Sequence, residues 1–165
     1  MRLHRIIALM AASVVCSSGL GQTVDDFFVE QKLIASDGMD WDDFGASVAI
    51  SGDTMVIGAE QDDDNGGNSG SAYIFERNSV GVWSEVQKLN GSISGSRFGC
   101  SVAISGDTVV VGADNFDNDD ESGRAYVFER NSVGIWSYVQ TLKPSDGAEG
   151  DRFGASVSIS GETLV

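Results

Sequence analysis

Histidine, cysteine and proline are scarce in this chain. Its 165 residues contain one histidine, two cysteines and one proline. The histidine, His4, lies at the very start, so the rest of the chain has no imidazole to serve as a general base or a zinc ligand. Cys100 is the only cysteine after residue 16, which excludes an intrachain disulfide beyond that point. Because alanine takes its place in the other repeats described below, we expect a small buried side chain rather than a reactive thiol.

Basic residues are also few. The chain has 10 lysines and arginines against 25 aspartates and glutamates, which gives a net charge of −15. A field of this sign repels polyanions, so nucleic acid and anionic membrane surfaces are poor partners. Cations and basic surfaces fit the charge better.

Only the first residues form a long apolar run. Arg2 and Arg5 precede the apolar residues 6–16, and small residues follow as far as Gly21. This pattern is typical of a secretory signal peptide, and the run is shorter than the roughly 20 residues that a membrane span needs. We predict that residues 1–21 are a signal peptide cleaved near Gly21. The mature chain is then expected to be secreted, extracellular or periplasmic, without a membrane span.

The rest of the chain repeats itself. Residues 44–60 return as residues 98–114 with 13 of 17 positions identical, and a third copy begins at residue 153. Residues 72–89 return as residues 125–142 with 14 of 18 identical. A repeat of this length indicates one supersecondary unit stacked side by side, because a single unit cannot bury its own apolar surface.

Each repeat predicts four short antiparallel strands, which in the first repeat cover residues 46–51, 54–59, 71–76 and 83–89. Gly52 and Asp53 form a two-residue turn with glycine first, as a type II′ hairpin requires. Val48 and Ile50 alternate onto one face of the first strand, whereas the second strand is apolar on both faces. We therefore predict an all-β fold of β-propeller-type blades, residues 22–165, with repeats that start near residues 44, 98 and 153.

Two repeats are complete, and parts of others flank them. Residues 29–33 resemble a fourth strand, and the chain ends inside a second strand. Because a propeller usually needs at least four blades to close, we expect a part of a longer reading frame. Assembly with other blades or copies, and an open stack, remain alternatives.

The paired Phe-Gly and Gly-Ala sequences resemble those of FG-GAP repeats, which form the blades of the integrin α-subunit propeller and occur in many secreted bacterial proteins. The residues that carry the resemblance are Phe44, Gly45, Gly58, Ala59, Phe98, Gly99, Gly112, Ala113, Phe153 and Gly154. The proline that follows Gly-Ala in the family is Glu60 in the first repeat and Asp114 in the second. We expect the three phenylalanines to pack between blades.

The resemblance also implies calcium, which many FG-GAP repeats hold in the loop after Gly-Ala-Pro. Ca²⁺ takes six to eight oxygen ligands, and acidic residues in a tight loop supply them. Both loops depart from the family pattern: Gln61 occupies the first ligand position of one, and Ser122 replaces the glycine of the other. Solvated acidic turns are the alternative to a metal site. The candidate ligands are Asp62, Asp63, Asp64, Asn65, Asp117, Asp119 and Glu121.

Function is predicted less directly than fold. The resemblance implies a secreted, non-enzymatic module that binds a protein or a carbohydrate, with a role in adhesion. Trp83 and Trp136 recur one repeat apart and would either stack on sugar rings or, as we favour, cover blade edges. A structural part of an extracellular assembly is the alternative. An enzyme is less favoured, because the clustered acids recur in both repeats and catalytic groups normally break a repeat's symmetry.

Overall fold

The computed structural model describes residues 6–12, 27–114 and 122–165, and in these ranges it contains strands and turns but no helix. The first blade is a four-stranded sheet in the order β3-β4-β5-β6, and the second blade has the order β7-β8-β9-β10. All their neighbouring strands are antiparallel. The strands of the two blades are β3 (Ser47–Ser51), β4 (Thr54–Ala59), β5 (Ser71–Arg77), β6 (Trp83–Asn90), β7 (Phe98–Ser105), β8 (Thr108–Ala113), β9 (Arg124–Arg130) and β10 (Trp136–Leu142).

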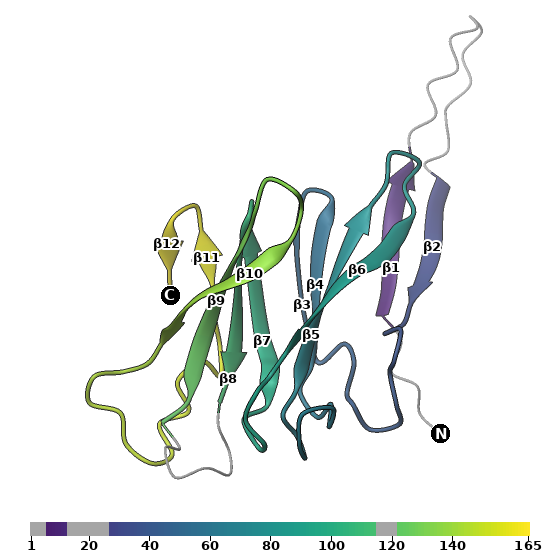
Figure 1. Ribbon diagram of the computed structural model, residues 1–165. Coiled ribbons are helices and arrows are strands. Elements are labelled where there is room, and N and C mark those ends of the chain that lie inside the picture. Colours follow the sequence, from purple (N-terminus) through teal and green to yellow (C-terminus); the bar gives the residue numbers. More distant parts are fainter. Residues whose placement is uncertain (1–5, 13–26, 115–121) are drawn as a thin grey trace, which may run out of the picture.

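Two strand pairs flank the blades. β1 (Ile6–Ala12) pairs with β2 (Phe27–Leu33) beside the first blade, and β11 (Ile159–Ser160) pairs with β12 (Thr163–Leu164) beside the second (Figure 1). β11 and β12 are the first two strands of a third repeat, as the sequence predicts. The predicted propeller-type organisation of four antiparallel strands per repeat is therefore confirmed.

The tight hairpin between the first two strands of each blade forms as predicted. Ser51 pairs with Thr54 across the turn, which leaves two residues in the loop. Gly52 has a φ of 59°, and Asp53 is absent from the residues of positive φ. A positive φ at the first loop residue alone distinguishes type II′ from type I′.

The core lies between the sheets. β4 is buried along its whole length, as its continuous apolar sequence predicts. Val56 and Ile74 of the first blade belong to one apolar cluster with Phe98 and Val102 of the second. Val48, on the outer face of the first blade, is exposed, whereas its counterpart Val102 is buried by the first blade. Stacking of blades thus buries the apolar face that a single sheet leaves exposed.

The glycines of the repeat motif allow the backbones of neighbouring blades to touch. A Cβ added to Gly58 would lie 2.0 Å from the carbonyl oxygen of Gly99, and one added to Gly112 would lie 1.9 Å from that of Gly154. The same carbonyls accept hydrogen bonds of 2.7 Å from the hydroxyl groups of serines in the preceding blade, Ser47 and Ser101. The Phe-Gly turn of one blade therefore docks directly on the Gly-Ala strand end of the blade before it.

Trp83 and Trp136 are both buried, so their rings are not available to stack on sugar rings. Gln31 donates to the Trp83 carbonyl at 2.7 Å and accepts from the Trp83 amide at 2.9 Å. Gln87 holds Trp136 in the same way, with the same distances. In each case the glutamine amide pairs with the backbone as a neighbouring strand would. This confirms the prediction that the tryptophans cover blade edges.

Replacing Gly112 with alanine tests the docking of the blades. Because the new methyl group would meet a backbone oxygen rather than a flexible side chain, we expect Gly112→Ala to lower the free energy of unfolding by about 3 kcal/mol or more. Urea denaturation followed by circular dichroism measures the loss.

Gly106→Ala is the matched control. Gly106 lies in the hairpin turn at a φ of 57° with no atom near its added Cβ, so only the conformational cost of about 1–2 kcal/mol applies. Equal losses in the two variants would contradict the close approach at Gly112.

Candidate functional site at the loop end of the blades

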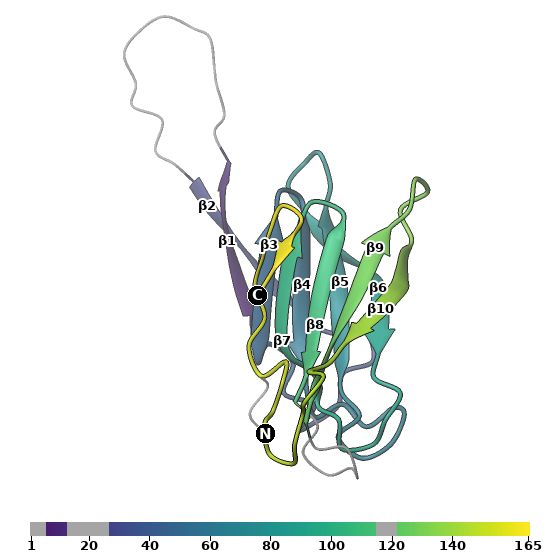
Figure 2. The same ribbon diagram turned by 90° about the vertical axis from the view of Figure 1, so that its left-hand side faces the viewer.

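The longest loops of the described residues gather at one end of the blades. The loop between β4 and β5 emerges there, and so do the three segments that lead into the Phe-Gly turns, residues 34–46, 91–97 and 143–152 (Figures 1 and 2). Backbone hydrogen bonds join the loops, since Gly95 donates to Gly67 at 2.8 Å and Arg97 donates to Asn68 at 3.0 Å. The hairpin turns between β5 and β6 and between β9 and β10 lie at the opposite end.

A lysine lies among the acids of the first loop. The Nζ atom of Lys88, on β6, is 2.9 Å from a carboxylate oxygen of Asp62 and 2.6 Å from one of Asp64. It is also 2.7 Å from Asp37, which the preceding inter-blade segment supplies. The hydroxyl group of Tyr73 lies 2.9 Å from an oxygen of Asp37 and 2.9 Å from one of Asp62, so its single proton is shared between the two carboxylates. One ammonium group therefore contacts three carboxylates from two segments and offsets one of their three negative charges.

Burial makes this network sensitive to the loss of any member. Asp62 is only 3% exposed and Tyr73 is fully buried. Burial opposes the charged form of Lys88, but hydrogen bonds to Asp37, Asp64 and Asp62 outweigh it, so the pKa of Lys88 is raised. Burial first, and then the neighbouring carboxylates, raise the pKa of Tyr73. The lysine thus stays charged and the phenol stays neutral throughout the physiological range.

The other predicted ligands of the first loop shape the loop itself. Asp63 accepts a 2.7 Å hydrogen bond from the amide of Asn68, and Asn65 donates at 3.1 Å to the carbonyl of Gly91. Donors of the chain itself, among them the ammonium of Lys88, engage at least one oxygen atom of each of Asp62, Asp63 and Asp64. A calcium ion at this loop would have to compete with these donors.

The second acidic loop cannot be compared with the first acidic loop. Asp117, Asp119 and Glu121 lie outside the described residues. Within residues 6–12, 27–114 and 122–165, no group of three or more histidine, cysteine or acidic side chains is arranged to hold a metal. Calcium binding by the chain stays a prediction from the sequence.

The acids that replace the family proline pair with arginines of the Phe-Gly turns. Glu60 forms an ion pair with Arg97. Asp114, only 2% exposed, lies 3.1 Å from the Nε atom of Arg152 and 3.3 Å from Arg97. Both arginines have left-handed backbone conformations, with φ of 54° and 53°. Each replacement therefore adds a charged contact between successive blades.

Cys100 is half-buried, rather than buried as predicted, and its sulfur lies 3.6 Å from the carbonyl oxygen of Gly154. Burial, and then the charge of Asp114, raise the pKa of the Cys100 thiol to about 11. A thiol with such a pKa is almost entirely protonated at neutral pH and is a poor nucleophile.

Lys88, Asp37, Arg97 and Arg152 are the functional residues that the sequence reasoning missed. A comparison of the two repeats carries a signal for one of them, because Lys88 aligns with Thr141 inside an otherwise similar segment. The role of Asp37 has no such signal, since it depends on the path of a segment that comes between blades.

Removal of the lysine charge tests the first loop. In Lys88→Met, Asp37, Asp62 and Asp64 repel one another without a cation, so we expect a melting temperature several degrees below that of the parent chain in EDTA. Ca²⁺ should recover more of this loss than it adds to the parent, because it can take the place of the ammonium. Melting curves in EDTA and in excess Ca²⁺ measure both effects. Lys32→Met, on β2, is the control. An equal response to Ca²⁺ in the parent and in Lys88→Met would contradict the role of Lys88 as the cation of the first loop.

Comparison with known families agrees with the geometry of the blades. The family model of the FG-GAP repeat matches residues 27–75, 83–128 and 136–165, which is most of the chain. No curated protein matches the chain. The three matched segments together contain every Phe-Gly turn and Gly-Ala strand end described above. The chain therefore belongs to the FG-GAP repeat family.

Proposed function

We propose that this chain is a secreted, non-enzymatic module that binds a protein or a carbohydrate through the loop end of its blades. One observation carries the proposal: a stacked β scaffold holds several irregular loops side by side at one end. Loops fixed by a rigid scaffold are where binding residues concentrate in proteins of many folds. Adhesion is the biological role that such a module would serve.

The use of the charged groups supports a binding role over an enzymatic one. The clustered acids Asp62 and Asp114 are engaged with Lys88 and Arg152, respectively, and these pairs join neighbouring segments. Catalytic acids instead need a perturbed pair whose two members can exchange a proton with substrate. Membership of the FG-GAP family points the same way, because its propeller-type repeats suggest binding modules.

Secretion rests on the N-terminal sequence. Arg2, Arg5 and the apolar run after them have the composition of a signal peptide. Among the described residues no helix is both long and apolar enough to cross a bilayer. The intact mass of the exported protein tests this part of the proposal: a chain that starts near Gln22 supports it, and an uncleaved chain contradicts it.

Calcium is proposed as a stabilising ligand on the sequence of the acidic loops alone. The first loop already has its cation in Lys88. The net charge of −15 still favours association with divalent cations in general. The melting curves in EDTA and Ca²⁺ described above test this part as well.

A binding screen tests the proposed function. The full chain, in buffer with Ca²⁺, is applied to a glycan array and used to capture proteins from an extracellular fraction. We expect at least one glycan or protein to bind, and binding to be retained in Val133→Ser, which alters the hairpin turn at the opposite end of the second blade. A folded chain that retains neither a glycan nor a protein would contradict the proposal.

A further inference from the structure

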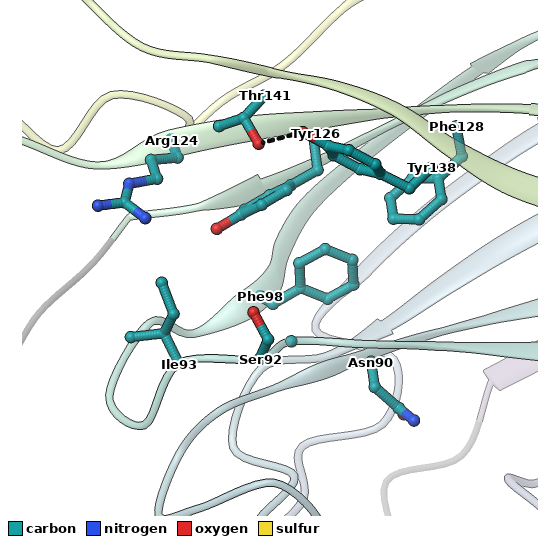
Figure 3. Close-up of a pocket in the computed structure, with 10 residues that line it drawn as sticks. Asn90, Ser92, Ile93, Phe98, Arg124, Tyr126, Phe128, Tyr138 and Thr141 are labelled. Atoms are coloured by element: carbon teal, nitrogen blue, oxygen red, sulfur yellow. Dashed lines mark hydrogen bonds between the residues drawn. The ribbon is translucent and has the colours of Figure 1, made fainter.

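Two of the junctions in this chain are built differently, although the repeats are similar. The first junction is formed where the segment after β2 meets the first blade, and the second is formed where the segment after β6 meets the second blade. At the second junction a cavity of about 450 Å³ opens between the end of β6 and the strands β9 and β10. Among the described residues, four aromatic rings line it, those of Phe98, Tyr126, Phe128 and Tyr138. Figure 3 shows Tyr126 and Thr141 on one side of the cavity and Ser92 and Ile93 on the other.

At the first junction the chain fills the corresponding place with its own residues. The amide and hydroxyl groups of Ser36 both donate to Glu85 at 2.8 Å. Asp37, the next residue, accepts hydrogen bonds from Tyr73 and Lys88. The segment after β2 therefore covers Tyr73, which has no exposed surface.

Three changes remove this filling at the second junction. Eight residues separate Leu89 from Phe98, whereas ten separate Leu33 from Phe44, so the segment is two residues shorter. The Ser-Asp-Gly sequence of residues 36–38 recurs in residues 145–147 but is missing from the shorter segment. The repeat partners of Glu85 and Lys88, which held that sequence, are Tyr138 and Thr141.

These changes leave hydrogen-bonding groups and aromatic surface at the cavity. Tyr126 is the repeat partner of Tyr73, but its hydroxyl group has no hydrogen-bond partner among the described residues, where Tyr73 has two carboxylates. Tyr138 is 58% exposed and its hydroxyl group lies 3.1 Å from that of Thr141. The rings of Phe98 and Phe128 pack edge to face with Tyr126 and Tyr138, respectively, and this packing fixes the walls.

We propose that this cavity binds the pyranose ring of a neutral carbohydrate. A pyranose presents a face of C–H groups, which packs on the electron-rich face of an aromatic ring such as Tyr138. Its hydroxyl groups both donate and accept, as do those of Tyr126, Thr141 and Ser92. The volume lies within the range of small-ligand pockets. The inference rests on the proposed binding function and names the ligand class of one site.

The charges of the chain and of the cavity wall favour a neutral sugar over the other ligands that aromatic rings attract. The net charge of −15 opposes the approach of acidic sugars and other anions. No acidic side chain is among the described residues that line the cavity, so a cationic ligand would find no counter-charge in this part of its wall. The ligand that fits the described lining is uncharged.

Titration of the full chain with four methyl pyranosides tests the proposal, namely those of glucose, galactose, mannose and N-acetylglucosamine. Saturation-transfer and chemical-shift NMR identify binding, and the titration gives the Kd. We expect at least one pyranoside to bind and Tyr138→Ala to raise its Kd at least tenfold. The melting temperature should fall by only a few degrees, because Tyr138 is 58% exposed and loses one edge-to-face contact, with Phe128. Tyr126→Phe, which removes one hydroxyl group and keeps the ring, should raise the Kd several-fold.

Val80→Ser is the matched control, since Val80 is an exposed residue in the hairpin turn at the far end of the first blade. Its Kd should equal that of the parent. A Kd that is unchanged in Tyr138→Ala would contradict the proposal that the cavity is the binding site, but it would not contradict the proposed binding function. A cooperatively folded chain that binds no pyranoside would also overturn the site, and a protein captured in the screen above would still support the function. Failure of both experiments would overturn both proposals.

Discussion

Direct backbone contact between neighbouring blades is the constraint on which the rest of this structure depends. The carbonyl groups of Gly99 and Gly154 lie where a side chain on Gly58 or Gly112 would have to be. Because the sheets approach so closely, the apolar faces of the strands exclude water and the serine hydroxyls reach the same carbonyls. The spacing also brings residues 91–97 against the loop of the preceding blade, where Gly95 donates to Gly67 and Arg97 donates to Asn68. The polar networks at the loop end are a consequence of that proximity.

Basic side chains are placed among clustered acids in a chain that is strongly acidic overall. Lys88 meets three carboxylates, and the arginines of the Phe-Gly turns meet Glu60 and Asp114. Such buried or half-buried pairs contribute less through net attraction than through the cost of leaving any one charge alone. They therefore specify which segment lies against which loop, in addition to the register that the glycines impose.

The fold could be predicted from the sequence because it rests on local patterns. Gly52 at the start of a two-residue turn, the apolar run of β4 and the recurrence of Phe-Gly are each visible without a structure. The exposure of Val48 and burial of Val102 could not be predicted, since the two residues occupy the same repeat position and differ only in what lies beside them. The expected blade-edge role of Trp83 was confirmed, but its partner Gln31 lies 52 residues away.

The acidic loop shows where sequence reasoning stops. A run of aspartates has the composition of a calcium site. Composition alone does not show that a lysine from another strand, Lys88 of β6, lies among them. Asp62 and Lys88 are 26 residues apart and meet only because β5 and β6 pair. The cavity at the second junction has the same origin, because it results from a shorter segment together with two changed side chains on β10.

The second junction is open because it lacks the residues that fill the first junction. A graft tests this: residues 36–42 replace residues 92–96, which keeps Gly91 and Arg97, and Tyr138→Glu and Thr141→Lys restore the partners of the grafted segment. The measurement is the free energy of unfolding from urea denaturation. We expect the graft to be more stable than the parent, because Tyr126 gains a carboxylate partner and the cavity is filled. A graft that folds cooperatively but is no more stable than the parent would contradict it.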